Sequence, residues 1–410
     1  MFNRPSQPRA RGHARAQILR ARALCVVAVL VAVWASAPPS AHATAYTAPG
    51  GKVLVGVSGG RSVDGYVRAS GKRPAMFQFF VAWGDRFRYA YRRAAQARAG
   101  LMVHLSTYNG PGTHERITPR AIALGRGDGY LLSLGRAFAA HGQPVYLRLF
   151  GEMNNAANPY SAFNHDGSSR GSAHGPFWFR QAWRRVYLVV KGGRVATINA
   201  RLRALGLPPV RHTRASPARS MRCVAGGLLM RRSERAVVQL PRPKLAVQWA
   251  PMTAGSPDIA ANRPGRYWPG GAYVDWVGTD FYSRFPSFSD LDRFYSTKRY
   301  GRKPFVFGEW GMWGRDTPSF VPRFFAWVAT HRRVRMLAYY QGNRTTSEFR
   351  LYRYPKASRA IRKALRSPLY TGRPRTTPAG SLSPMMCPTV SEVSRVTGHP
   401  ERYGVLESDR

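Results

Sequence analysis

Short apolar segments alternate with amphipathic stretches along most of this chain. Eight of the apolar segments have the length and the β-branched and aromatic content of buried strands. The stretches between them carry a helical spacing; over 176–190, for example, Phe179, Trp183 and Val186 fall on one face. Strands that alternate with helices in this way are typical of βαβ units around a parallel sheet. Eight units in a chain of 410 residues predict a fold of the α/β class, a single (β/α)8 TIM barrel.

The barrel is expected to occupy residues 52–370, after an entry segment over 44–51. The stretch 192–242 is longer than a barrel connection requires, which predicts an insertion before the fifth strand, with a helix near 195–204. Residues 371–410 are rich in Pro, Ser and Thr and are expected to form a C-terminal extension that is loosely packed or disordered. The expected strands are 53–57, 75–81, 101–106, 145–150, 245–249, 274–281, 305–308 and 334–340, and the expected helices are 86–98, 129–141, 176–190, 291–299, 318–331 and 358–365.

The first 43 residues have the three parts of a secretory signal. Arginines without any acid are followed by the apolar run Leu24–Ala35 and then by Ala41-His-Ala43, a small-x-small cleavage site. The run is shorter than the roughly 20 residues that span a bilayer. We therefore expect a Sec-type signal peptide over 1–43, cleaved near Ala43, and a secreted protein, with an uncleaved anchor as the alternative. Removing this segment would leave Cys223 and Cys387, which could form one disulfide or remain two thiols.

The chain is strongly basic, with a formal net charge of +45 and 64 Lys and Arg against 19 Asp and Glu. Arginine supplies 56 of the 64 basic residues, and these are spread over the whole sequence. No zinc-finger, RNA-recognition or helix-turn-helix signature accompanies them, so nucleic acid is not expected as a partner. Two interpretations remain: a basic solvated surface, or association with an acidic polymer or a cell envelope.

Two glutamates end apolar runs that are expected to be the fourth and seventh strands: Glu152 in Tyr146–Asn155 and Glu309 in Lys303–Gly311. The carboxyl ends of the strands build the active site of a (β/α)8 barrel. A pair of carboxyl groups is what glycoside hydrolysis requires, one as acid and one as nucleophile. Strand alternation puts Arg148, Phe150 and Glu152 on one side, where Arg148 would keep a neighbouring carboxylate ionised. The alternative is that each glutamate is only a salt-bridge partner of the many arginines.

The residues around these glutamates resemble glycoside hydrolase family 26, the β-mannanase family, over roughly residues 51–365. The family's fourth-strand pattern is matched by Arg148, Glu152, Met153 and Asn154, its sixth-strand pattern by the segment Tyr267–Tyr282, and its seventh-strand pattern by Lys303, Pro304, Glu309 and Gly311.

The resemblance implies Glu152 as general acid/base, Glu309 as nucleophile and Tyr282 as a hydroxyl that orients the nucleophile. Retention of anomeric configuration follows if the two carboxyl groups lie about 5 to 5.5 Å apart. One position departs from the family, because Gly151 stands where a histidine usually precedes the acid/base. His104, near the end of the third strand, could supply an imidazole instead, or it could be an ordinary polar residue of the barrel.

Further candidates for substrate binding are polar and aromatic side chains near strand ends, because sugar faces pack on flat rings. For each aromatic residue, core packing is the alternative. The candidates are Arg148, Asn154, Trp249, Tyr282, Trp313, His104 and Trp83, with Trp310, Tyr340, Asn155 and Gln341 as further options.

No metal or nucleotide cofactor is expected, since the sequence has neither a His-Glu-x-x-His motif nor a phosphate-binding loop. The sequence therefore predicts a monomeric, secreted, retaining glycoside hydrolase that cleaves a β-linked polysaccharide, of the endo-β-1,4-mannanase type. The alternatives are a β-glucanase of the same fold, a non-catalytic carbohydrate-binding envelope protein, and a basic exported protein that binds an anionic polymer.

Overall fold

Eight parallel strands close into a barrel in the computed structural model, which describes residues 46–60, 62–211, 238–342 and 347–372. Neighbouring strands pair in chain order, and the last strand, β10, pairs with β1, so the sheet has no free edge. The expected (β/α)8 TIM barrel and its eight strands are confirmed. The barrel strands are β1 (Val53–Ser58), β2 (Met76–Ala82), β3 (Gly100–Ser106), β4 (Val145–Leu149), β7 (Leu245–Trp249), β8 (Trp276–Tyr282), β9 (Phe305–Gly311) and β10 (Val334–Tyr340).

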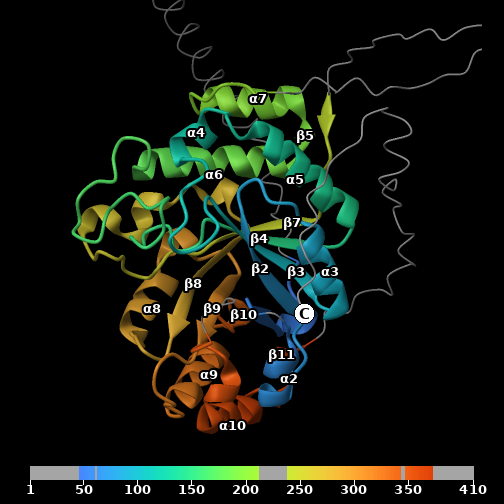
Figure 1. Cartoon of the computed structure of the whole chain (residues 1–410), viewed down its shortest axis with the longest axis vertical. Helices are drawn as coiled ribbons and strands as arrows, with labels where there is room; N and C mark the ends of the chain where they lie inside the picture. The colour runs from blue at the N-terminus through green and yellow to red at the C-terminus, as the bar shows by residue number, and fades with distance from the viewer. Residues whose placement is uncertain (1–45, 61, 212–237, 343–346, 373–410) are drawn as a thin grey trace, which may run out of the picture.

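Helices surround the barrel, as Figure 1 shows. The large core lies between them and the outer faces of the strands; on α6, Phe179 and Trp183 are fully buried in it. The helices are α2 (Asp64–Ser70), α3 (Arg88–Gln96), α4 (Pro119–Ala123), α5 (Asp128–His141), α6 (Pro176–Lys191), α7 (Val195–Ala204), α8 (Phe288–Tyr295), α9 (Phe320–Thr330) and α10 (Pro355–Ala364).

Four helical expectations differ from the structure. Helix α10 begins at Pro355 and not at 358, and α4, with only 5 residues, was not expected. The helix expected over 291–299 begins earlier, at Phe288, because Phe288 is buried on the same face as Leu291 and Phe294, at intervals of three residues. The Ser287 hydroxyl donates to the Asp290 carboxylate at 2.6 Å across the first turn. The helix ends at Tyr295, and a 3-10 turn follows over Lys298–Tyr300. Helix α2 was not expected, since it is only 7 residues long and contains a glycine.

The barrel interior changes from apolar to polar toward the carboxyl ends of the strands. One end is filled by a separate cluster that includes Met76, Met102, Tyr146 and Trp276. Further along, cross-strand pairing places four side chains in one row: Phe80 beside His104, His104 beside Arg148, and Arg148 beside Gln248. Buried polar groups require hydrogen-bond partners, so this row marks the end of the barrel where chemistry can take place.

The insertion before the fifth barrel strand contains α7, as expected, and an antiparallel pair formed by β5 (Gly193–Arg194) and β6 (Gln239–Leu240). At the other end of the chain, β11 (Tyr370–Thr371) pairs with β1. The signal segment, the three cysteines and residues 373–410 lie outside the described residues. Within the described ranges, none of the helices combines the length and apolar character needed to cross a bilayer.

Candidate active site

A β-bulge turns Glu309 into the mouth of the barrel. Thr279 of β8 pairs with Phe307, but the next residue, Asp280, pairs with Glu309, so Gly308 is the extra residue of β9. Simple alternation from the inward-facing Val306 would have pointed Glu309 outward. Asp280 fixes the bulge, because its Oδ1 accepts the backbone N–H of Glu309 at 2.8 Å.

Glu152 reaches the same mouth by a different device. Strand β4 ends at Leu149, and both Phe150 and Glu152 adopt left-handed backbone conformations, with φ of 46° and 51°. The expectation that Arg148, Phe150 and Glu152 share a side is wrong for Phe150, whose ring packs outward against Trp83. A left-handed non-glycine residue costs about 1–2 kcal/mol. At Glu152 the conformation is held by its N–H, which donates to the Ala250 carbonyl at 2.8 Å.

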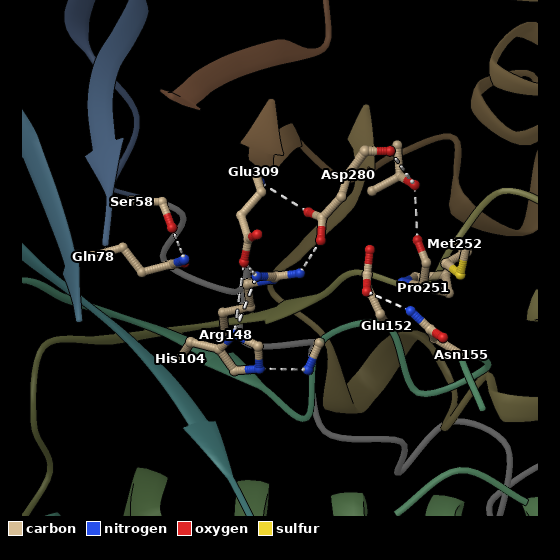
Figure 2. A network of polar contacts seen from close by, with 12 residues as sticks. Ser58, Gln78, His104, Arg148, Glu152, Asn155, Pro251, Met252, Asp280 and Glu309 are labelled. Carbon is tan, nitrogen blue, oxygen red and sulfur yellow. Dashed lines mark hydrogen bonds and ion pairs between the residues drawn. The ribbon is translucent and has the colours of Figure 1, made fainter. Parts of the chain in front are cut away.

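The guanidinium of Arg148 joins the carboxylates of Glu309 and Asp280 and is fully buried. Nη1 donates to Glu309 Oε1 and Nη2 to Asp280 Oδ2, as Figure 2 shows. Burial has the largest single effect and would raise the pKa of Glu309, but the charge of Arg148, together with the contacts of His104 and Tyr282, outweighs it and lowers that pKa to about 2. Glu309 is therefore a carboxylate at neutral pH.

Two glycines make room for this guanidinium. A Cβ at Gly151 would lie 2.6 Å from Arg148 Nε, and one at Gly308 would lie 2.8 Å from the same atom. Side chains at either position would therefore displace Arg148. The absence of the family's histidine at 151 has a steric explanation in this chain: the guanidinium occupies the space beside Gly151.

Glu152 has the opposite protonation tendency to Glu309. Burial, and then the charge of Glu309, raise its pKa, while Arg148 and the amide of Asn155, which donates to Oε2 at 2.9 Å, oppose the shift. Burial and the neighbouring carboxylates raise the pKa of Asp280 as well. Three carboxyl groups thus face one guanidinium, and since the pKa values of Glu152 and Asp280 are raised while that of Glu309 is lowered, Glu309 is the group of the three that ionises most readily.

His104 lies beneath the pair as a neutral ring. Burial, and then the charge of Arg148, lower its pKa to about 4. Its Nδ1 is 3.1 Å from Arg148 Nη1, and its Nε2 accepts the N–H of Gly151 at 3.3 Å. A neutral imidazole has one acceptor nitrogen, and here it is Nε2, so Nδ1 carries the proton and also lies 3.9 Å from Glu309 Oε1. The imidazole that sequence placed near the site is present and contacts the backbone of Gly151.

Tyr282 orients the second oxygen of Glu309, since its hydroxyl donates to Oε2 at 2.7 Å. Burial and the charge of Glu309 raise the pKa of Tyr282, so the hydroxyl remains protonated and available as a donor. Arg148 and Tyr282 together fix both oxygens of Glu309.

Two hollows meet at the carboxyl pair, and both Glu152 and Glu309 line each of them. The first has a volume of about 580 Å³ and is bounded by the rings of Phe80, Tyr108 and Tyr340. The second, of about 430 Å³, is bounded by Tyr282, Phe285, Trp313 and Phe349. Apart from the buried Arg148, neither hollow is lined by Lys or Arg.

Several residues expected to bind substrate are placed elsewhere. The side chain of Trp249 is fully buried among Trp268, Phe294 and Tyr300 of the outer layer. Trp83 packs against Tyr130, and Trp310 packs in the core. Trp310 thus takes the core-packing alternative that was open for each aromatic residue. Substrate contact is not available to these three tryptophans.

Asn154 is also buried and has a structural role. Its Oδ1 accepts the N–H of Met252 at 2.8 Å, and its Nδ2 donates to the carbonyls of Met252 and Ala254. The amide therefore fixes the loop after β7 against the turn that carries Glu152. Of the expected residues, His104, Tyr282, Trp313 and Tyr340 do line the hollows, together with Asn155.

Sequence reasoning missed several lining residues, of which Phe80 is the most informative. Phe80 is 45% exposed, and its ring lies 5.0 Å from that of His104. The sequence carried a signal for Phe80, because it follows the polar Gln78 by two residues in the same strand, and strand alternation puts both side chains on one face. The other missed residues are Tyr108, Asn158, Tyr160, Phe285 and Phe349.

Metal binding has no obvious place at this site. Among the described residues, no group of three or more His, Cys, Asp or Glu side chains is arranged to hold an ion. The three carboxyl groups of the mouth are instead neutralised in part by Arg148.

Comparison with known proteins gives distant structural matches only. No protein-family model and no curated protein matches this sequence. The fold resembles a mannanase of Bacillus subtilis (16% identity, 83% of this chain and 92% of that one, TM-score 0.46). It also resembles a family 26 protein of Muricauda (14% identity, 82% and 95%, TM-score 0.45) and the family 26 domain of a Prevotella bryantii endo-β-mannanase/endo-β-glucanase (14% identity, 78% and 90%, TM-score 0.44). These values describe a distant likeness of overall fold.

Proposed function

We propose that this protein is a retaining glycoside hydrolase that cleaves a neutral, β-linked polysaccharide. The observation that carries the proposal is the opposite tuning of two carboxyl groups at one barrel mouth: Arg148 keeps Glu309 ionised, while the pKa of Glu152 is raised. Separated protonation states are what an acid and a nucleophile need. The sequence patterns shared with glycoside hydrolase family 26 support the same assignment.

In the first step Glu309 attacks the anomeric carbon, and Glu152 protonates the leaving oxygen. Forming the glycosyl ester removes the charge of Glu309, which is one of the causes that raise the pKa of Glu152. The pKa of Glu152 then falls, which suits its second task as the base that activates water. Water displaces the sugar from Glu309 with a second inversion, so the configuration is retained.

The two hollows support cleavage within a chain and a neutral sugar. Substrate units can lie on both sides of the pair, because each hollow reaches Glu152 and Glu309. Exposed rings line both hollows, and among the described lining residues the one cation is the buried Arg148, which favours pyranose faces over carboxylate or phosphate groups. At the rim of the second hollow, Arg284 lies over the ring of Trp313, 4.9 Å from its centroid. The family patterns make β-1,4-mannan the first substrate to test, with β-glucan second. The proposal includes export through the N-terminal signal segment.

The test is hydrolysis of mannans, β-glucans and xylans by the purified protein, followed as new reducing ends. Glu152→Gln and Glu309→Gln should each lower kcat by at least 10³-fold, since each removes a group that reacts. Glu115→Gln is the matched control, because Glu115 is a carboxylate of the same rim that bonds to Thr107 and His174 and lines neither hollow. Equal rates in wild type and both site variants would refute the proposal.

A second candidate is a non-catalytic carbohydrate-binding protein, for which Gly151 is the observation in favour. It predicts saturable binding of a glycan, no new reducing ends, and unchanged affinity in Glu309→Gln.

A further inference from the structure

A third hollow lies on the outer wall of the barrel, between α2 and α10. Its volume is about 620 Å³, and it shares no lining residue with the two hollows of the candidate active site. Figure 1 shows the two helices side by side, and α10 packs on α2. We call it the α2–α10 hollow; Arg68, Arg359, Arg362 and Tyr352 line it, and none of its lining residues is acidic.

The arginines of this hollow are not paired with carboxylates. Arg68, Arg359 and Arg362 form no ion pair among the described residues. Arg362 donates to the carbonyls of Arg68 and Ala69 at the end of α2, so its position is fixed. Arg68 and Arg359 are exposed, and their guanidinium groups remain available for an external anion.

The three arginines of the hollow are carried by helices, Arg68 by α2 and the other two by α10. The N-terminus of α10 is capped by Asp316, whose carboxylate accepts the N–H groups of Lys356 and Ala357 at 2.8 and 2.9 Å. The Ser358 hydroxyl donates to the Leu351 carbonyl at 2.9 Å and joins α10 to the 3-10 turn before it. A fixed frame limits the entropy that a ligand must remove on binding.

Tyr352 adds an open aromatic face to the same hollow, since it is 56% exposed. Three residues earlier in the chain, Phe349 lines the second hollow of the candidate active site. The short segment 349–352 therefore connects the two places along the chain. A flat ring beside guanidinium groups suits a pyranose that carries a negative group.

We propose that the α2–α10 hollow binds an anionic glycan, a chain of pyranose rings bearing carboxylate or phosphate groups. Its volume lies within the range of about 300–1,000 Å³ that is usual for ligand sites. The hollow docks the protein on an acidic polymer, while the barrel mouth, whose two hollows have the buried Arg148 as their one cation among the described lining residues, acts on a neutral chain. The binding does not depend on the hydrolytic function and is measured separately from it.

The experiment measures the affinity of the purified protein for two polymers, polygalacturonate as the carboxylate source and a sugar-phosphate polymer as the phosphate source. Arg68→Ser/Arg359→Ser should weaken binding about tenfold or more, because each guanidinium makes a charge-assisted contact. Tyr352→Ala should weaken it several-fold. The matched control, Arg194→Ser/Arg203→Ser, removes the same charge from exposed positions on or before α7, at the opposite end of the molecule in Figure 1, and should change affinity less than twofold.

Equal weakening in the two double variants would mean diffuse attraction to the basic surface and would overturn the proposal. The proposal would also be overturned if single-stranded RNA bound tightly and displaced both glycans, or if the wild-type protein bound neither polymer. Unchanged affinity in Tyr352→Ala would overturn it as well. Thermal unfolding verifies that each variant is folded. If the double variant is not folded, the single variant Arg359→Ser is measured in its place. Unchanged hydrolysis of the neutral substrate in the Arg68/Arg359 variant separates this test from the one above.

Discussion

Replacing Arg148 with Met should convert the barrel mouth from a stabilising to a destabilising cluster at neutral pH. In the wild type, Arg148 holds the pKa of Glu309 at about 2 against an ordinary value of 4.5. A carboxyl group whose pKa is lowered by folding stabilises the fold above its unfolded pKa, and this contribution is lost as the pH falls through the folded value. For Glu309 the pH window therefore runs from about 4.5 down to about 2.

The size of the effect follows from the same two values. The difference corresponds to roughly 3 kcal/mol of the free energy of unfolding at pH 7 and to about half of that or less at pH 3. Breaking a buried ion pair by removing one partner typically costs about 3–5 kcal/mol, which agrees in order of magnitude. In the variant, the contacts of His104 and Tyr282 still oppose burial, but the largest opposing cause is gone, so the pKa of Glu309 rises. The stability that depends on its low pKa is then reduced, and the pH dependence of unfolding between about 4.5 and about 2 becomes weaker.

Urea unfolding at pH 7 and pH 3 tests this directly. Arg148→Met should lose about 3 kcal/mol or more at pH 7 and clearly less at pH 3. Arg333→Met is the matched control, because Arg333 is partly buried but donates only to backbone carbonyls, those of Tyr295, Tyr300 and Lys303. Its loss should not depend on pH in this range. A loss for Arg148→Met that is the same at both values would refute the electrostatic reasoning.

Three further variants test the frame of the site. Gly151→Ala should cost about 1–3 kcal/mol in urea unfolding, because its Cβ meets the Arg148 guanidinium, whereas Gly129→Ala, which meets nothing within 4 Å in α5, should be neutral or slightly stabilising. Tyr282→Phe should lower kcat about tenfold and move the acidic limb of the pH–rate profile to higher pH, because the nucleophile loses a hydrogen bond to its ionised form; a profile that does not move would contradict this. Asn154→Ala should cost about 2–3 kcal/mol of stability with little change in KM, and a large rise in KM at normal stability would restore a substrate contact.

The barrel itself was predictable because its signal is distributed. Each strand is a short run of buried residues, such as Leu245–Trp249, and the local pattern and the tertiary environment agree. Helix α8 begins earlier than expected because Phe288, the first residue of its buried face with Leu291 and Phe294, was not counted as part of the helical pattern. Short elements such as α2 carry too few residues for a period to be recognised.

The position of the site was predictable, but its geometry was not. Alternation along a strand assumes regular pairing, and both glutamates reach the mouth through irregular backbone: a bulge at Gly308 and left-handed residues at Phe150 and Glu152. The same irregularity explains why Phe150 points outward, against expectation. Tryptophans were overvalued as sugar-binding residues because the pattern does not distinguish a ring under a helix, such as Trp249, from one at the rim, such as Trp313.

Gly151, which stands where the resemblance to family 26 leads one to expect a histidine, has a steric explanation in this structure. A histidine there would have to displace the Arg148 guanidinium, whose Nε lies 2.6 Å from the position of a Cβ. The chain instead places an imidazole on the neighbouring strand β3, where His104 accepts the N–H of Gly151. The glycine thus allows Arg148 to reach Glu309 and Asp280, and the imidazole acts through the backbone of residue 151. Arg148 lowers the pKa of the proposed nucleophile Glu309, and Gly151 leaves the space that Arg148 needs to do so. The lack of a side chain at residue 151 is therefore not by itself evidence against catalysis.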